Sequence, residues 1–259
     1  MEIPIYQVDA FTSRVFRGNP AAVCPLETWI EDERMQAIAA ENNLSETAFF
    51  VRSGSRYRLR WFTPAVEVDL CGHATLASAE VIFRFLDPGA REIVFETRSG
   101  DLTVGRDGER LTMDFPSRPA VRCEPHPRLI EGLGAHPVEI LAARDYLVVY
   151  PMEDDVRELR PDFRILADLD RFAVIVTAPG RDSDFVSRFF APAQGVDEDP
   201  VTGSAHCTLT PYWARRLGKN RLQARQVSRR GGELECEDLG SRVRISGRAV
   251  LFLRGSIYA

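Results

Sequence analysis

Short runs in which apolar and polar residues alternate, or in which β-branched and aromatic residues gather, recur along the whole chain. Such runs predict β-strands. In the first half of the chain they lie at 3–8, 21–24, 46–51, 57–62, 92–97, 102–104 and 110–115. In the second half they lie at 145–150, 172–177, 222–227, 233–237, 242–245 and 249–253. The pattern therefore predicts many short strands in each half.

Helical periodicity is found in fewer segments. Between 31 and 42, Met35, Ile38 and Ala39 have the i, i+3, i+4 spacing of an amphipathic helix. The segment 73–85 is apolar around most of its circumference, which predicts a helix buried among strands rather than one lying on a surface.

A third helix is expected from 203 to 217, where Gly218 has the position of a C-terminal cap. Pro211 lies inside this segment and lacks the N–H group that a helix interior uses. We therefore expect Pro211 to bend the helix or to separate its first turn from the rest.

The two halves share one eight-residue pattern. F-x-P-A-x-x-V-D occurs at 62–69 and again at 190–197, an offset of 128 residues. Each copy is followed within a few residues by a glycine, Gly72 or Gly203, that opens a helical segment. A proline-rich stretch between the halves, at 116–127, suits a domain boundary. The chain is predicted to be a duplicated, two-lobed protein with its site between the lobes.

Composition narrows the function further. The 259 residues carry a net charge of −5, whereas a nucleic-acid binder is expected to be basic. No apolar run approaches the ~20 residues of a membrane span, and the N-terminus lacks the pattern of a signal peptide. We therefore expect a cytoplasmic protein that binds neither nucleic acid nor membranes.

Metals and cofactors are also not expected. Five cysteines are scattered without a C-x-x-C pair, and none of the four histidines has a metal-binding spacing. The glycine-rich motifs of nucleotide-binding loops are missing from the sequence. The expected partner is a small molecule.

The segments that open the two central helices carry most of the chemistry. They read D-L-C-G-H-A-T at 69–75 and D-E-D-P-V-T-G-S-A-H at 197–206. A helix N-terminus presents unpaired N–H groups and a favourable dipole to an anion, so two such ends would bind a carboxylate. The alternative is that their glycines serve only close helix packing.

Glu46 lies where a helix gives way to a strand, among polar residues and in front of the apolar run 48–51. Partial burial there would raise its pKa toward the range that is useful in proton transfer. The alternative is a solvated glutamate at a helix end, which the spacing alone does not exclude.

Cys71 precedes the first of these glycines and is positioned like one thiol of a two-thiol racemase. Its counterpart, counted back from Gly203, is Thr202. The thiol pair is therefore broken, and a small buried residue at the helix start is the better interpretation of Cys71. The basic turn 226–232 is either a solvated hairpin or a segment that faces the substrate.

Five blocks together resemble the phenazine-biosynthesis PhzF-like family. They read V-D-A-F-x-x-x-x-F-x-G-N-P-A-A-V, N-L-S-E-T-A-F, F-T-P-x-x-E-V-D-L-C-G-H-A-T-L-A, E-D-P-V-T-G-S-A-H and Q-x-S-x-R-G-G, in family order from the N-terminal region to residue 232. The resemblance implies the diaminopimelate epimerase-like fold, an α+β fold of two pseudo-symmetric lobes. Each lobe would be a curved, mostly antiparallel sheet around a central helix.

The resemblance also implies lobe boundaries and site residues. The N-terminal lobe would span 1–115 with about 250–259, the C-terminal lobe 120–249, and the active site the cleft between them. A cofactor-independent isomerase is expected, which moves a proton between carbons of a small carboxylate, and a homodimer is expected from the family. The residues carried over are the catalytic Glu46, His73 and Asp199, and the substrate-binding Gly72, Gly203, Ser204 and Thr202.

Two other functions stay open at this point. One is a two-base epimerase or racemase of an amino or hydroxy acid, in which Asp199 is the second base. The other is a binding protein that keeps the fold without catalysis.

Overall fold

The chain divides into two compact units, as a computed structural model of residues 1–259 shows. The first unit comprises 1–114 and 246–259, and the second comprises 115–245. The second unit is thus inserted into the first along the chain, and strands β8 and β17 carry the chain across the two boundaries. None of the helices is long and apolar enough to cross a membrane.

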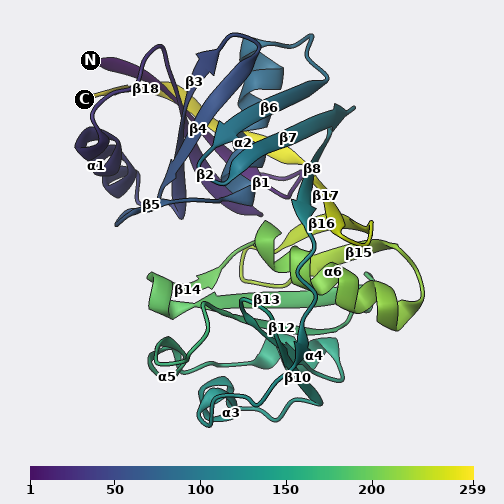
Figure 1. Ribbon diagram of the computed structural model, residues 1–259. Helices are drawn as coiled ribbons and strands as arrows, with labels where there is room; N and C mark the ends of the chain where they lie inside the picture. The colour runs from purple at the N-terminus through teal and green to yellow at the C-terminus, as the bar shows by residue number, and fades with distance from the viewer. The chain divides into compact units, whose positions relative to one another are not determined.

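The first unit is mostly strand, with two α-helices and one turn of π-helix (Figure 1). Its strands are β1 (Glu2–Ala10), β2 (Asn19–Leu26), β3 (Glu46–Ser53), β4 (Arg56–Phe62), β5 (Glu67–Val68), β6 (Glu92–Thr97), β7 (Gly100–Asp107), β8 (Arg110–Pro116) and β18 (Ala249–Tyr258). Its helices are α1 (Asp32–Asn42), α2 (Gly72–Val81) and the π-helical η1 (Ile82–Leu86). The helix expected at 31–42 is confirmed as α1, and the one expected at 73–85 as α2 with η1.

The second unit is also built of short strands and a few helices. Its strands are β9 (Val121–Arg122), β10 (Glu139–Ala142), β11 (Tyr146–Val149), β12 (Val174–Pro179), β13 (Phe185–Ala191), β14 (Val196–Asp199), β15 (Arg221–Gln226), β16 (Gly232–Asp238) and β17 (Arg242–Gly247). Its helices are α3 (Leu129–Leu133), α4 (Glu153–Glu158), α5 (Phe163–Ala167), α6 (Gly203–Leu217) and a 3₁₀ turn, η2 (Pro192–Gln194).

Strand pairing repeats between the units, in the same order and with the same directions. Strand β1 is antiparallel to β2, β2 parallel to β3 and β3 antiparallel to β4. Strands β10, β11, β12 and β13 follow the same sequence of directions. The parallel pair β4–β6 with the hairpin β6–β7 recurs as β13–β15 with β15–β16. The predicted α+β fold is therefore confirmed for each unit, and the predicted pseudo-symmetry is confirmed by the repeated strand pairing.

The central helix of the first unit is enclosed by its strands. Of the ten residues of α2, eight are buried: His73, Ala74, Thr75, Leu76, Ala77, Ser78, Ala79 and Val81. Small side chains allow strands to pack against all sides of the helix. The two hydroxyl-bearing residues satisfy themselves locally, since Thr75 donates to the Cys71 carbonyl at 2.6 Å and Ser78 donates to the Ala74 carbonyl at 2.7 Å. The expectation of a buried, mostly apolar helix is confirmed.

The central helix of the second unit, α6, runs unbroken through Pro211, so the expected separation of its first turn is wrong. A proline removes the N–H that would bond to the carbonyl four residues earlier. That carbonyl belongs to Cys207, and it accepts instead from the backbone N–H of Arg118 at 2.9 Å. A partner from outside the helix thus compensates for the lost bond.

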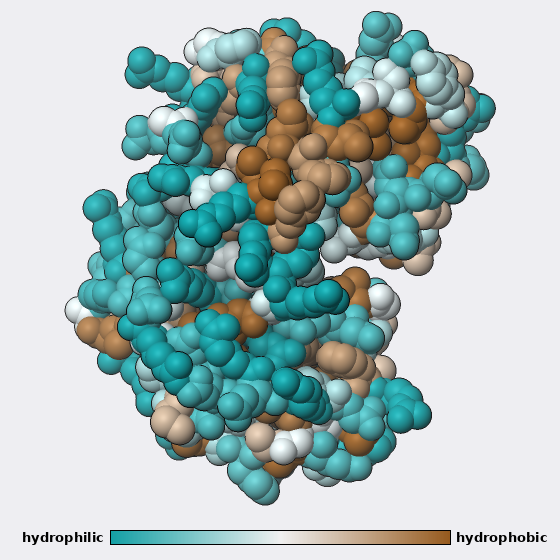
Figure 2. Space-filling view, turned by 180° about the vertical axis from the view of Figure 1, so that it is seen from behind, coloured by the Kyte–Doolittle hydropathy of each residue, from teal (hydrophilic) through white to brown (hydrophobic).

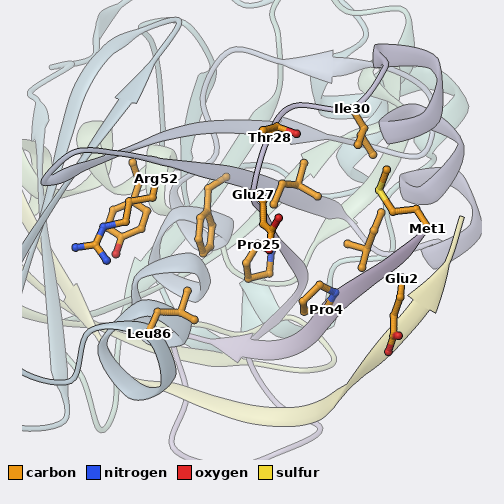
Figure 3. A pocket seen from close by; sticks show the side chains of 13 residues that line it. Met1, Glu2, Pro4, Pro25, Glu27, Thr28, Ile30, Arg52 and Leu86 are labelled. Atoms are coloured by element: carbon orange, nitrogen blue, oxygen red, sulfur yellow. The ribbon is translucent and has the colours of Figure 1, made fainter.

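The first unit also contains a cavity of about 660 Å³ (Figure 3). Its walls come from the carboxyl ends of β2 and β3 and from the start of β1, and they include Pro25, Leu26, Phe50 and Arg52. Apolar side chains also gather on a face of this unit (Figure 2). No histidine or cysteine lines the cavity, so it lacks the chemistry that the sequence predicts for the active site.

Candidate active site

Glu46 and His73 lie together in the first unit, at the amino ends of β3 and α2. The Glu46 carboxylate (Oε2) approaches the His73 ring nitrogen Nε2 to 3.2 Å, without the angles of a full hydrogen bond. The side chain of Glu46 keeps 18% of its surface exposed, whereas that of His73 keeps 5%. A partly exposed carboxylate beside a buried imidazole is suited to exchanging protons with a ligand.

Burial controls the charge of His73. It lowers the pKa of the imidazole to about 3, because a charged ring would lose its hydration inside the protein. The nearby Glu46 carboxylate would favour the charged ring, yet this one contact does not offset the loss of hydration that burial of the ring imposes. His73 is therefore a neutral imidazole at pH 7, and its contact with Glu46 is not an ion pair of opposite charges.

The other ring nitrogen of His73, Nδ1, has two neighbours. The Asn19 amide nitrogen lies 3.2 Å away and the Cys71 sulfur 3.5 Å away. Cys71 is the N-cap residue of α2, has an extended backbone, and gives the helix no side-chain cap. The helix thus begins at Gly72 and His73 without a side-chain cap, and a helix start of this kind suits an anion.

Ligand atoms of Glu46, Cys71 and His73 all lie within 4.8 Å of one another, close enough to share a metal ion. Glu46 and Cys71 nevertheless approach different ring nitrogens of His73. The two side chains thus hold the imidazole ring between them, and the three groups do not direct their ligand atoms at one cation.

In the second unit, a short loop before α6 is held by three hydrogen bonds to one buried amide. Gln226, at the end of β15, accepts from the Thr202 N–H at 2.8 Å. Its amide nitrogen donates to the Asp199 carbonyl at 2.8 Å and to the Thr202 hydroxyl at 3.3 Å. The Thr202 hydroxyl in turn donates to the Asp199 carboxylate. Asp199 and Thr202 are therefore fixed against each other at the start of α6.

Ser204 has a cationic neighbour in the same unit. Arg144 donates to the Ser204 hydroxyl at 3.4 Å and to both carboxylate oxygens of the buried Asp145 at 3.0 and 3.1 Å. Its guanidinium lies 4.3 Å from the ring centre of Phe172. Thr202 gives α6 no side-chain cap, so this helix also begins without one, at Gly203.

Matching positions of the two units carry matching hydrogen bonds. Ser99 donates to the Asp69 carbonyl at 2.8 Å, three residues before Gly72. Ser228 donates to the Pro200 carbonyl at 2.7 Å, three residues before Gly203. These serines follow β6 and β15, the strands that correspond in the two units, so they support the helix-opening loops in the same way.

A second match links Thr75 and His206, each of which bonds to the carbonyl of the residue before the glycine. Thr75 donates to Cys71, and the Nδ1 atom of His206 lies 2.9 Å from the Thr202 oxygen. His206 is wholly buried, and burial lowers its pKa to about 4. Its role is thus structural, on the buried side of α6.

Acid and base groups, in contrast, are not duplicated. Thr47 pairs with Phe62 in the first unit, and Val174 pairs with Phe190 in the second. The residues that precede them, Glu46 and Ala173, therefore occupy matching positions, and Ala173 has no titratable group. Cys71 aligns with Thr202. The first unit therefore has a carboxylate and an imidazole at positions where the second has none, and the second has Asp199 in a loop that is three residues longer.

Sequence reasoning named Glu46, His73, Gly72, Asp199, Thr202, Gly203 and Ser204, and the structure groups them by unit. The first three lie in one unit and the last four in the other. Three residues that contact them were missed as contributors: Asn19, Arg144 and Gln226. Ser228, which donates to Pro200 in the segment before α6, was missed as well. Asn19 lies in the G-N-P block, and Gln226 and Ser228 in Q-V-S-R-R-G-G, so a signal was present for three of them. Arg144 lies outside every block.

Three comparisons with known proteins identify the family of the chain. The chain matches the PhzC-PhzF family model, described as phenazine biosynthesis-like protein, over residues 8–255. An uncharacterized isomerase of Pseudomonas aeruginosa is 55% identical over 258 residues, and the alignment covers 100% of both chains. A PhzF family protein of Enterococcus faecalis is 48% identical, with a TM-score of 0.97 over 100% of both chains.

The fold extends to more distant proteins. A hydroxyproline epimerase from Agrobacterium vitis has a TM-score of 0.61 at 9% identity, and the match covers 99% of this chain and 92% of that one. This likeness concerns the fold alone, and it agrees with the epimerase-like architecture expected from the sequence.

Proposed function

Because the chain belongs to the PhzC-PhzF family of phenazine biosynthesis-like proteins, we propose that it is an isomerase that moves a proton between carbons of a small carboxylate. Glu46 is the general acid and base of this proposal. It takes a proton from a carbon next to an electron-withdrawing group and returns it to another carbon. Neither a metal nor a cofactor takes part.

The pairing of Glu46 with a neutral His73 is the observation that carries this proposal. The 3.2 Å contact keeps the ring against the carboxylate that must change its protonation state. A neutral ring leaves the carboxylate free to act as a base, whereas a permanent imidazolium would hold it ionised and lower its basicity. His73 would assist the transfer by stabilising charge on Glu46 or on the substrate.

Substrate binding is assigned to the helix starts. In the first unit, the start of α2 at Gly72 has no side-chain cap and suits a carboxylate. In the second unit, the start of α6, with Gly203 and Ser204, has the same property. Thr202 and Asp199, held by Gln226, would add hydroxyl and carboxylate contacts. Excluding water from these groups would strengthen each interaction.

A single base favours isomerisation over inversion at one carbon. A two-base racemase needs a proton donor and an acceptor on opposite faces of the substrate, and Ala173 and Thr202 occupy the positions that would supply the second. Asp199 is the remaining candidate for a second base, and its carboxylate already accepts from the Thr202 hydroxyl.

The test is solvent-deuterium incorporation, screened over cyclic and acyclic unsaturated carboxylates, with the wild type, Glu46→Gln and a control, Glu41→Gln. Glu41 is exposed at the end of α1, so its substitution removes a carboxylate outside the site. Loss of general acid–base catalysis is expected to slow exchange by about 10²–10⁴-fold in Glu46→Gln and to leave the control unchanged. Full exchange in Glu46→Gln would refute the assignment.

The same experiment separates the two alternatives. Deuterium that enters only at a stereocentre with inversion, and that is lost in Asp199→Asn, would indicate the two-base epimerase. Carboxylate binding without any exchange would indicate a binding protein.

A further inference from the structure

Asn19 lies at the first position of β2 and is wholly buried. Its side-chain nitrogen is 3.2 Å from Nδ1 of His73. This contact determines which ring nitrogen of His73 carries the hydrogen, because an amide nitrogen can only donate whereas a ring nitrogen can donate or accept.

The direction of this hydrogen bond follows from the atoms involved. An amide nitrogen carries two hydrogens and can only donate. Nδ1 must therefore accept, and in a neutral imidazole the single ring hydrogen is then on Nε2. Nε2 is the atom that approaches the Glu46 carboxylate. The ring thus presents an N–H to Glu46, and the opposite tautomer would bring a lone pair against a carboxylate oxygen.

The backbone holds Asn19 in this place. Gly18 has a φ of +65°, and a Cβ atom built there would lie 2.1 Å from the Ala10 carbonyl oxygen, so only glycine fits this turn. The β1–β2 ladder then begins with Asn19 opposite Ala10, and Pro20 follows with its restricted φ. The G-N-P block therefore fixes the amide before any ligand arrives.

Cys71 does not impose the same constraint. Its sulfur lies 3.5 Å from Nδ1, and a thiol both donates and accepts weakly, so it is compatible with either tautomer. Of the two groups at Nδ1, only the amide of Asn19 selects one form of the ring.

We propose that Asn19 is a positioning residue that fixes His73 as the Nε2–H tautomer, so that the ring directs an N–H, and not a basic lone pair, toward the Glu46 carboxylate. The effect on catalysis rests on the proposed function, whereas the tautomer itself does not.

The direct test is ¹⁵N NMR of the ring nitrogens in the uniformly labelled full chain without substrate. The chain has only four histidines, so the spectrum of His73→Gln identifies the signals of His73. Near pH 7 we expect a pyridine-like Nδ1 and a pyrrole-like Nε2. The reverse pattern, or averaged signals of two tautomers, would overturn the proposal.

Asn19→Asp tests the causal step. A carboxylate only accepts, so it would draw the ring hydrogen to Nδ1 and exchange the two types of signal. Deuterium exchange is expected to fall about 100-fold in rate at saturating substrate, with KM little changed, because the ring then directs a lone pair, and no longer an N–H, toward Glu46. Asn220→Asp, which introduces the same charge at an exposed position, is the matched control and should behave as the wild type.

Asn19→Ala provides a second variant if the buried aspartate prevents folding. It removes the donor without adding charge, and it should yield averaged tautomer signals. An unchanged Nε2–H tautomer in Asn19→Ala or Asn19→Asp would show that another group fixes the ring. Because the NMR measurement needs no substrate, its result is independent of whether the isomerase assignment holds.

Discussion

Gln226 makes three hydrogen bonds to the loop before α6, and their removal should lower the free energy of unfolding. In Gln226→Leu the residue keeps roughly the same volume, but the Thr202 N–H and the Asp199 carbonyl lose the partners that the amide supplies. Each buried polar group left without a partner costs about 1–3 kcal/mol. Two such groups cost about 4 kcal/mol at the middle of that range, and added apolar burial returns about 1.5 kcal/mol. We therefore expect a net loss of about 2.5 kcal/mol in the free energy of unfolding.

Urea unfolding followed by circular dichroism measures this loss, and hydrogen exchange locates it. The Thr202 amide should be protected in the wild type and should exchange much faster in Gln226→Leu. Gln223→Leu is the matched control, since Gln223 lies on the same strand with an exposed side chain. If the two variants lost equal stability, or if the Thr202 amide stayed protected, the inference that Gln226 holds this loop would be wrong.

Four further predictions concern stability, substrate binding and assembly. Ser99→Ala and Ser228→Ala should each lose about 0.5–1.5 kcal/mol in urea unfolding, because each removes one matched hydrogen bond to a helix-opening loop. The free energy of unfolding should fall as the pH drops from about 6.5 toward about 4, by up to about 1.4 kcal/mol per pH unit for each buried histidine, and His206→Phe should reduce this slope. The sign follows because burial lowers both folded-state pKa values, so the unfolded chain binds protons in this range while the folded chain does not. Ser204→Ala should raise KM for the carboxylate substrate about 10-fold in steady-state kinetics while kcat changes little, and a large fall in kcat would instead assign Ser204 to the chemistry. The homodimer expected from the family stays a prediction, which light scattering of the purified chain tests.

Much of the fold follows from local pattern. The spacing of Met35, Ile38 and Ala39 predicts α1, and those three residues are the buried ones of that helix. The apolar circumference of 73–85 predicts a helix enclosed by strands. Strand β13 was missed because all seven of its residues are buried, so the alternation that marks a half-exposed strand is not present.

Contacts between distant segments account for what the sequence did not predict. The effect of Pro211 depends on Arg118, more than ninety residues earlier in the chain, whose N–H replaces the missing one. Likewise, Asn19 contacts His73 across 54 residues and Gln226 contacts Thr202 across 24. No local periodicity encodes such pairs. Their residues could be noticed in motifs, but their partners became clear only from the fold.

The insertion of the second unit into the first has a consequence for how the chain is made. Strand β1 pairs with β18 along its whole length, yet β18 is synthesised only after the entire second unit. The second unit is continuous and can acquire all of its strands while translation proceeds. The first unit must hold β1 without its partner until β18 leaves the ribosome. Until then, the unit that contains Glu46 and His73 exposes an unpaired edge, so the nascent chain is most vulnerable to misassociation in the half that carries the proposed chemistry.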